Sequence, residues 1–579
     1  MRARRNSLCS AALGGGTVPT RALVQSTECL FIARFDIFLS FILTNVGLLT
    51  YSHPNKPDYH QKQSTLGGAE MGTATRLPLV AATLYLGASV LAVHPASASE
   101  LIRIVSPYKT TTLDPLRSAA AGNIETYGQL YARLVQRNTA NGELEAGLAE
   151  SWDISEDGRT YTFRLRDAKF SNGTTITADD VVFSLSRIHD DKQSAYPAPL
   201  GAVVTITASD PKTVVIRLKS AFAPFLGNLE IWNMGIVSKA DVEAQGAEKA
   251  FSSAPVTSGP YAVKEWKPND KLVLQPNEHY WRSGYPKSDA IVELKEVASP
   301  ETRAAMLKAG EAEVVRAVPW AQIDDLKATD SIDMRLEPST TIYMTLMNHK
   351  REPFSNMKAR QAAAYAIDNK AMAKAITRGY AEPANTTLPG SIDFHDKDNP
   401  GIPFDSAKAK QLLIESGMSG HEVKILATSG ATEQQMALLL QAQWQAIGLK
   451  PVIVNVDSGA WWDATAKGDY DAAANWWYNE TPDPDLAVRW AVCGTCGSNS
   501  YNTFYANPKV DELVAQGTME TDLQKRAEIY KEIQRITTEE VSQIPLFYAP
   551  NAVAYSKNLE GIKLTPSLQW TLEDTTVAK

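Results

Sequence analysis

The sequence contains few residues that bind metals. Its 579 residues include only 4 Cys and 8 His, and the His residues are scattered, with no pair at the spacing of a metal site. Two of the cysteines, Cys493 and Cys496, form a C-G-T-C motif, but no further Cys or His lies nearby to complete a zinc site. The sequence therefore predicts no metal site and no cofactor.

The sequence also lacks the marks of nucleic-acid-binding proteins and of common enzymes. The formal net charge is −8, with no basic stripe and no basic tail, so no nucleic-acid partner is expected. Nothing in the chain matches a nucleophile elbow, a phosphate-binding loop or a metalloprotease helix. We therefore expect a protein that is not an enzyme.

A hydrophobic run near the N-terminus is typical of an export signal. From Met71 the chain reads MGTATRLPLVAATLYLGASVLAVHPASASE, with one basic residue, an apolar run over 77–93 and an A-x-A sequence at 96–98. This pattern predicts a signal peptide over 71–98 and a mature start near Ser99. A transmembrane helix is the alternative, but the apolar run is short for a bilayer. The chain is thus expected to be exported, to the periplasm or outside the cell.

Residues 1–70 lie upstream of this signal, where nothing should precede it. The hypothesis is that Met71 is the true start and that 1–70 is an untranslated extension. The alternative is an N-terminal anchor at Phe31–Tyr51, which Arg34 and Asp36 interrupt. In an exported chain, Cys493 and Cys496 would most simply form one disulfide, although free thiols or a redox pair remain alternatives.

Predicted strands and helices alternate along the rest of the chain, which indicates an α/β fold with parallel pairing. Hairpins at 151–165 and 203–218, with a helix capped by Thr177 between them, suggest a separate α+β unit over 140–250. The other strands are expected at 101–106, 291–297, 314–317, 341–347, 423–427, 451–456 and 471–477. The other helices are expected at 123–136, 300–310, 358–377, 406–417 and 432–447.

The segment YDAAANWWYNETPDPDLAVRW, residues 470–490, combines a strand with aromatic and acidic residues at its carboxyl end. Ligands of open α/β sheets gather beyond the carboxyl ends of strands. Because side chains alternate along a strand, Trp476 and Tyr478 should share the ligand face, with Trp477 in the core. Asp483 and Asp485 are expected to cap the helix that follows rather than to contact the ligand.

Several blocks of the sequence resemble the peptide/nickel-type extracellular solute-binding proteins of ABC importers, family five. They are LEAGLAESWDISEDGRTYTFRLRDAKFSNGTTITADDVVFSLSRI (144–188), SGPYAVKEWKPNDKLVLQPNEHYW (258–281), PETRAAMLKAGEAEVV (300–315), PFSNMKARQAAAYAIDNKAM (353–372) and TPDPD (481–485) with YANPKVDELV (505–514). Together they cover the mature chain in order.

This resemblance implies a two-lobed, three-domain periplasmic binding protein fold of the class II type, in the large peptide-binding subclass. Lobe one would comprise 99–139, 251–338 and 544–579, lobe two would comprise 339–543, and 140–250 would be an inserted subdomain. Strands near Leu336–Thr345 and Ile544–Tyr548 would form the hinge, and the lobes would close over the ligand. The implied partners are a small solute, expected to be a peptide, and a membrane permease with its ATPase subunits. A monomer is expected.

Peptide-binding members of this family hold the ligand ammonium with an Asp shortly after a Trp. In this sequence Trp476 leads, Asn479 stands where that Asp belongs, and Glu480 follows. An amide carries no charge to pair with a buried ammonium. Either Glu480 or another acid takes over that role and the ligand is a peptide, or the ligand is a different solute such as a sugar or an opine.

The resemblance also places residues of the opposite lobe and of the hinge side in the cleft. Tyr108 follows the first strand, and Asn348 and Arg351 follow a hinge-side strand, where they could hold a carboxylate. For Arg351 a surface ion pair is the alternative. A nickel chelate with His349 as a contact is a second possible function, and an exported redox or folding helper using C-G-T-C is a third.

Overall fold

An 11-stranded mixed sheet runs through the computed structural model, which describes residues 100–138, 142–567 and 570–578. All of them lie in the compact unit His94–Lys579, one of the two into which the chain divides. The expected extension, signal peptide and anchor therefore fall outside the described residues. Among the described residues, the helices are all too short or too polar to span a bilayer.

One half of the sheet is built around β1 (Leu101–Ser106). This strand pairs in parallel with β10 (Ile291–Glu296) on one side and with β11 (Val314–Arg316) on the other. Between these two strands the chain forms α7 (Pro300–Ala309), which begins after Ser299 and ends at Gly310 with φ 71°. The predicted β-α-β unit is thus confirmed. The hairpin of β8 (Tyr261–Lys267) and β9 (Lys271–Pro276) extends this half.

The other half of the sheet is built around β14 (Glu422–Ala427), which pairs in parallel with β15 (Lys450–Asn455) and with β16 (Ala472–Trp477). The helix α12 (Ala431–Ile447) connects β14 to β15, and α13 (Ser458–Lys467) connects β15 to β16. The buried residues Trp444, Leu440 and Met436 of α12 pack in the core of this half. These elements agree with the expected α/β pattern.

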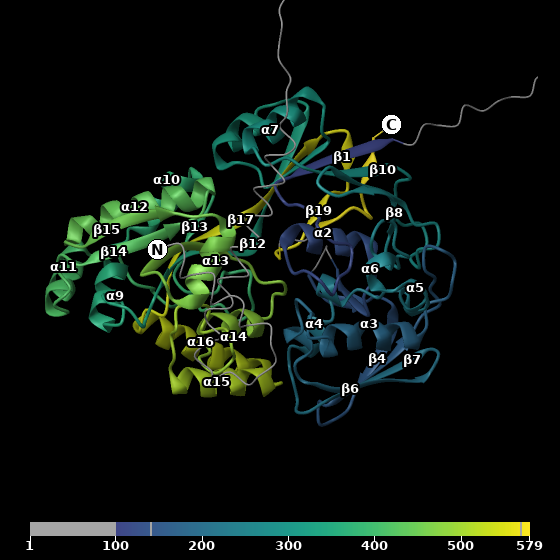
Figure 1. The fold of residues 1–579 in the computed structure, drawn as a ribbon, viewed down its shortest axis with the longest axis horizontal. Coiled ribbons are helices and arrows are strands. Elements are labelled where there is room, and N and C mark those ends of the chain that lie inside the picture. The colour runs from purple at the N-terminus through teal and green to yellow at the C-terminus, as the bar shows by residue number, and fades with distance from the viewer. Residues whose placement is uncertain (1–99, 139–141, 568–569, 579) are drawn as a thin grey trace, which may run out of the picture. The chain divides into compact units, whose positions relative to one another are not determined.

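Two long strands, β12 (Ile332–Met347) and β17 (Ile544–Ser556), join the two halves (Figure 1). They pair antiparallel, and the register shifts between Glu337 and Thr341. Before the shift β17 also pairs with β11, and after it β12 pairs with β16. These two strands therefore connect the halves, and they contain the segments that were expected to form the hinge.

A four-stranded antiparallel sheet stands apart from the large one, in the order β4-β5-β7-β6. Its strands are β4 (Ala149–Ile154), β5 (Thr160–Leu165), β7 (Thr213–Leu218) and β6 (Val203–Asp210). The helix α3 (Ala178–Asp190) packs on it, and the Asp180 carboxylate accepts a hydrogen bond of 2.9 Å from the Thr177 backbone N–H. Both hairpins and the cap at Thr177 are therefore confirmed.

Two predicted helices differ from the structure. The helix expected over 358–377 is two helices, α9 (Met357–Tyr365) and α10 (Asn369–Thr377), because Asp368 begins a new helix by accepting from the Ala371 N–H at 2.8 Å. The helix expected over 123–136 is α2 (Ala121–Leu130). Its predicted C-terminal part instead contributes to β2 (Val135–Arg137), which pairs with β3 (Leu144–Ala146).

Candidate functional site

A cavity with a volume of about 910 Å³ lies between the two halves of the fold. One wall comes from Tyr108, the 119–121 segment and the 195–198 segment, and the other comes from residues between Thr428 and Cys496. A volume of this size is typical of a small-molecule site, for which about 300 to 1,000 Å³ is usual. The walls are mainly aromatic and apolar, with three charged side chains.

The end of β16 supplies Trp476, Trp477 and Tyr478, and all three line the cavity. Trp476 stacks on Tyr478, with ring centroids 6.2 Å apart, and on Tyr343 of β12 at 6.3 Å. Both predicted ligand-face aromatics are thus brought together. Trp477 packs against a buried hydrophobic cluster, as expected, but this half-buried side chain also borders the cavity. Its ring packs on the opposite face of the strand.

Three further tryptophans that the sequence interpretation missed border the same cavity: Trp461 and Trp462 of α13, and Trp490 of α14 (Asp485–Val492). Trp490 stacks on Trp477 at 5.9 Å, with an angle of 22° between the rings. In the sequence, the adjacent pair Trp461-Trp462 near the start of a short helix could have indicated this part of the cavity wall. Such rings offer large, rigid contact areas to a ligand.

Asn479 lies at the position predicted for the ligand anchor, but its amide N–H groups are already engaged. They donate to the carbonyl oxygens of Thr481 at 2.6 Å and Asp483 at 2.8 Å. The Oδ1 atom is buried and has no hydrogen-bond partner. Asn479 thus shapes the turn after β16 and leaves one orphaned acceptor in a residue that lines the cavity.

Glu480 also lines the cavity and is only 5% exposed. Its carboxyl group forms a hydrogen bond with the hydroxyl group of Tyr196, which belongs to the opposite wall. Burial raises the pKa of Glu480 to about 7 from the ordinary 4.5. No positively charged side chain of the described residues forms an ion pair with it. A cationic group of a ligand would therefore stabilise the ionised carboxylate.

A second acid of the cavity, Glu433, was missed by the sequence interpretation. It lies in the first turn of α12, where a helix N-terminus favours negative charge, and it receives a hydrogen bond from Trp476. Burial raises its pKa. Glu433, Trp476 and the predicted residue Tyr108 also line a neighbouring cavity of about 480 Å³, so these three separate two compartments. Burial raises the pKa of Tyr108 to about 12.

Asn348 and Arg351 do not line this cavity, and other groups of the protein hold both side chains. The Asn348 amide is buried and donates to the Gly468 and Tyr470 carbonyl oxygens, at 2.9 and 3.0 Å. The Arg351 side chain pairs with Asp469 at 3.2 Å and Asp471 at 3.0 Å. Both residues fix the loops beside β16. The surface ion pair, which was the alternative for Arg351, describes it better.

His349, the contact considered for a nickel chelate, is also remote from the cavity lining. Its Nε2 atom lies 3.1 Å from the Ser542 carbonyl oxygen, and its ring packs edge-on against Tyr505. Burial lowers its pKa to about 3, so the ring is neutral. Over the described residues, no three His, Cys, Asp or Glu side chains gather in a way that could hold a metal ion.

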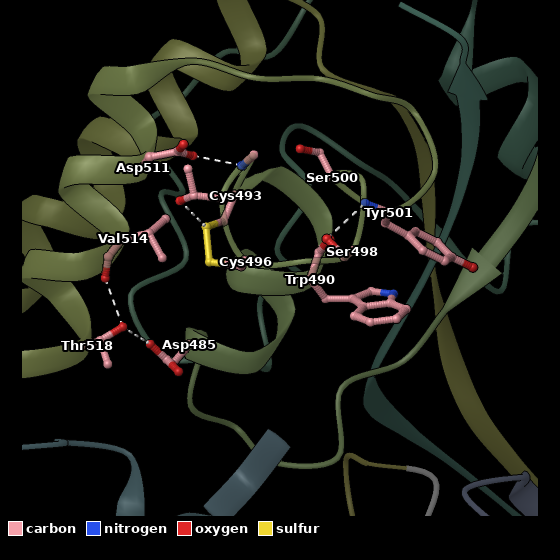
Figure 2. Close-up of a disulfide and its surroundings, with 12 residues drawn as sticks. Asp485, Trp490, Cys493, Cys496, Ser498, Ser500, Tyr501, Asp511, Val514 and Thr518 are labelled. Atoms are coloured by element: carbon pink, nitrogen blue, oxygen red, sulfur yellow. Dashed lines mark hydrogen bonds between the residues drawn. A yellow bond between two sulfur atoms is a disulfide. The ribbon is translucent and has the colours of Figure 1, made fainter. Parts of the chain in front are cut away.

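Cys493 and Cys496 are joined by a disulfide at the end of α14 (Figure 2). Cys493 is buried, whereas Cys496 is exposed and borders the cavity. The loop is fixed by the Gly494 N–H, which donates to the Asp511 carboxylate at 2.7 Å. The hydroxyl group of Ser498 donates to the Trp490 carbonyl oxygen, also at 2.7 Å. The disulfide thus constrains the loop at the end of α14, the helix that carries Trp490.

The acids of the T-P-D-P-D motif are structural. Asp483 forms an ion pair with the buried Arg526, at 2.8 Å to one carboxylate oxygen, and accepts from the Asp485 N–H at 2.9 Å. Asp485 lies in the first turn of α14 and accepts from the hydroxyl groups of Thr518 and Tyr530. The expected cap is therefore only partly observed: Asp483 accepts from the first N–H of the helix, whereas the N-cap residue is Pro484 and the Asp485 side chain accepts from no helix N–H.

Comparison with known proteins gives consistent results along most of the chain. The model of the bacterial extracellular solute-binding proteins, family 5 (middle), matches residues 143–499. The glutathione-binding protein GsiB of Escherichia coli (strain K12) is 32% identical over 443 residues, which cover 75% of this chain and 86% of GsiB.

Two solved structures share the fold. The dipeptide-binding protein of Pseudoalteromonas sp. SM9913 in complex with Met-Leu has a TM-score of 0.75 and 25% identity, covering 83% of this chain and 100% of that one. The periplasmic binding protein DppA of Helicobacter pylori in complex with the peptide STSA has a TM-score of 0.75 and 23% identity, covering 83% and 98%.

Proposed function

We propose that this chain, which belongs to the bacterial extracellular solute-binding proteins of family 5, binds short peptides in the cavity between its two lobes and delivers them to an ABC importer. The family consists of solute-binding proteins with the two-lobed fold, so the proposed activity is binding and not catalysis. The observation that carries the proposal is the buried Glu480 carboxyl group, which faces an aromatic cavity with no cationic partner from the described residues.

A peptide ammonium would supply the missing charge. A carboxylate in a water-excluded cavity gains strongly from an opposite charge, because the local dielectric is low. The Asn479 Oδ1 atom, buried and without a partner, adds a neutral acceptor in the adjacent residue. In this proposal Glu480 replaces the Asp of the peptide-binding relatives, one position further along the chain. Trp476 and Tyr478 would contact the rest of the peptide, and Tyr108 would contact it from the opposite lobe.

The three relatives described above bind peptides according to their names, namely glutathione, a dipeptide and a tetrapeptide, whereas another solved neighbour is in complex with agropinic acid. This supports the peptide class. The alternative is a non-peptide solute such as an opine or a sugar, and the specific observation behind it is the neutral Asn479 at the usual anchor position. A metal chelate through His349 has lost its structural support, because that ring is packed away from the cavity.

The partners follow from the same proposal. Family 5 proteins work with membrane permeases and their ATPase subunits, and we propose that this chain does so as a monomer in the periplasm of a Gram-negative bacterium. Lobe one would comprise 99–139, 251–338 and 544–579, and lobe two would comprise 339–543. The inserted subdomain, 140–250, contributes Tyr196 to the cavity. Flexing of β12 and β17 at the register shift would open and close the lobes.

A fluorescence titration tests the proposal, because five tryptophans line the cavity. Protein freed of bound solute by unfolding and refolding would be titrated with glutathione, with Met-Leu and with a neutral disaccharide. We expect a saturable change in tryptophan emission with at least one peptide and none with the disaccharide. Saturation by the disaccharide, with no response to either peptide, would favour the alternative.

A further inference from the structure

Arg489 is an arginine of the cavity wall that forms no ion pair with any described residue. It lies on α14, and the residues Leu486, Arg489 and Trp490 occupy one face of this helix and line the cavity. The opposite face, with Ala487, Val488 and Val492, is buried in a hydrophobic cluster. The helix thus directs the guanidinium group toward the same space as the aromatic rings.

Several other buried or half-buried arginines of this protein form ion pairs, whereas the buried Arg303 and Arg360 donate to backbone carbonyl oxygens instead. Arg137 lies 2.7 Å from Glu230, Arg187 lies 2.8 Å from Asp114, and Arg526 is paired with Asp483. Arg489 is also half-buried, yet it forms no hydrogen bond or ion pair with any of the described residues. A guanidinium group removed from water without a partner is costly, so a partner from outside the chain would stabilise it.

Neither of the two nearest acids in sequence forms an ion pair with Arg489. Asp485 lies one helical turn before Arg489; its buried Oδ1 atom accepts from the hydroxyl groups of Thr518 and Tyr530, and its Oδ2 atom is buried without a hydrogen-bond partner. Asp483 is held by Arg526. Arg489 acts on Asp485 only through its field, which is one of the smaller influences lowering that carboxyl's pKa against the dominant effect of burial.

The cavity wall therefore carries charged side chains of both signs. Glu480 and Glu433 provide negative charge, and Arg489 provides the positive charge on α14. Trp490, the next residue, stacks on Trp477 and borders the same cavity, so a solute bound at Arg489 would also contact aromatic rings. A guanidinium group is well suited to a carboxylate, which it can bind through two parallel hydrogen bonds.

We propose that Arg489 binds a carboxylate of the solute, so that the site selects zwitterions that carry both an ammonium and a free acid group. This inference rests on the proposed function and narrows it to peptides, or other amino-acid derivatives, with an unblocked carboxylate. Arg489 thereby takes the role that the sequence had suggested for Arg351.

The test compares matched solutes and matched variants by isothermal titration calorimetry. The probes are glutathione with its diethyl ester, in which both carboxylates are blocked, and Met-Leu with its C-terminal amide. The variants are Arg489→Gln, Arg489→Lys and the control Arg351→Gln, each checked for an unchanged circular dichroism spectrum. We expect Arg489→Gln to weaken binding of the free acids by about 10- to 100-fold, the range of a charge-assisted hydrogen bond.

The blocked probes should bind the wild type weakly, and the change Arg489→Gln should lower their affinity by less than about twofold. Arg489→Lys should recover part of the affinity, and Arg351→Gln should bind like the wild type. If Arg489→Gln binds the free acids as well as the wild type does, or loses equal affinity for free and blocked probes, the inference is wrong while the proposed function stands. If the wild type binds none of the four probes, the proposed function fails and this inference fails with it.

Discussion

Replacing Glu480 with Gln should make the empty protein more stable at pH 8 and at the same time weaken its solute binding. The Glu480 carboxyl group is 5% exposed, and burial raises its pKa from 4.5 to about 7. Because the pKa is higher in the folded state than in the unfolded state, folding favours the protonated form. The stabilisation from proton binding is fully present below pH 4.5 and is lost as the pH rises through 7.

The magnitude follows from the same values. A tenfold difference in proton affinity corresponds to ~1.4 kcal/mol, so a rise of the pKa from 4.5 to about 7 amounts to about 3 kcal/mol. Above pH 7 the ionised Glu480 should therefore cost about 3 kcal/mol of folding free energy, which Gln would avoid while keeping the contact with Tyr196. At pH 5 the wild-type carboxyl is protonated, and the difference should fall below about 1 kcal/mol.

Urea unfolding of solute-free protein at pH 5 and pH 8 measures both differences. Glu156→Gln, a change at an exposed acid, is the matched control and should alter stability by less than about 0.5 kcal/mol at either pH. The affinity of the wild type for Met-Leu should fall by up to about tenfold per pH unit below 7, and the Glu480→Gln variant should lack this dependence. A variant that is less stable than the wild type at pH 8 would refute the view that Glu480 is a buried, uncompensated charge.

Three other changes have defined outcomes. Trp476→Ala should lower the affinity for Met-Leu or glutathione by more than about tenfold in calorimetry while costing only about 1 to 2 kcal/mol in urea unfolding, since the ring is half-buried; an unfolded variant would show that Trp476 is structural. Reduction of the bond between Cys493 and Cys496 should lower stability by about 2 kcal/mol, the loop-closure entropy of so short a loop, and unchanged urea midpoints with and without reductant would contradict this. Asp483→Ala should cost about 3 kcal/mol, because it leaves the buried Arg526 without its carboxylate, and a loss below about 1 kcal/mol would show that the pair is solvated.

The fold could be predicted from local signals wherever hydrophobic periodicity and turn chemistry agreed. The hairpins around Asp157-Gly158 and Asp210-Pro211, the Thr177 cap and the α7 unit are such cases. The prediction of a single helix over 358–377 was wrong. It followed the Ala-rich composition of the segment, although Asp368-Asn369 marks the start of a second helix. The end of the helix predicted at 123–136 was wrong because strand pairing with Leu144–Ala146, a tertiary contact, decided the conformation there.

Two kinds of signal predicted parts of the candidate site. Alternation along β16 indicated Trp476 and Tyr478, and the family resemblance indicated Tyr108, Asn479 and Glu480, all of which line the cavity. Alternation along β16 gives no information about residues that other elements contribute to the cavity. Tyr196, Glu433 and Arg489 lie far apart in the sequence, and only the packing of three separate elements brings them to one cavity.

Arg351, which the sequence analysis named, and Arg489, which it did not, show the same limit. In the sequence Arg351 and Arg489 look alike, because both follow or precede apolar segments. In the structure Arg351 has two carboxylate partners, whereas Arg489 has none among the described residues. Which arginine remains available to a ligand therefore depends on the pairing of charges in three dimensions.

The central claim, that the cavity binds short zwitterionic peptides, is tested most directly by mass spectrometry of the solute that co-purifies with residues 99–579. The protein would be purified without unfolding and then denatured to release its contents. The account predicts glutathione or a mixture of short peptides with free carboxylates. A single non-peptide compound without an ammonium group would contradict it, and would show that Asn479 marks a change of ligand class.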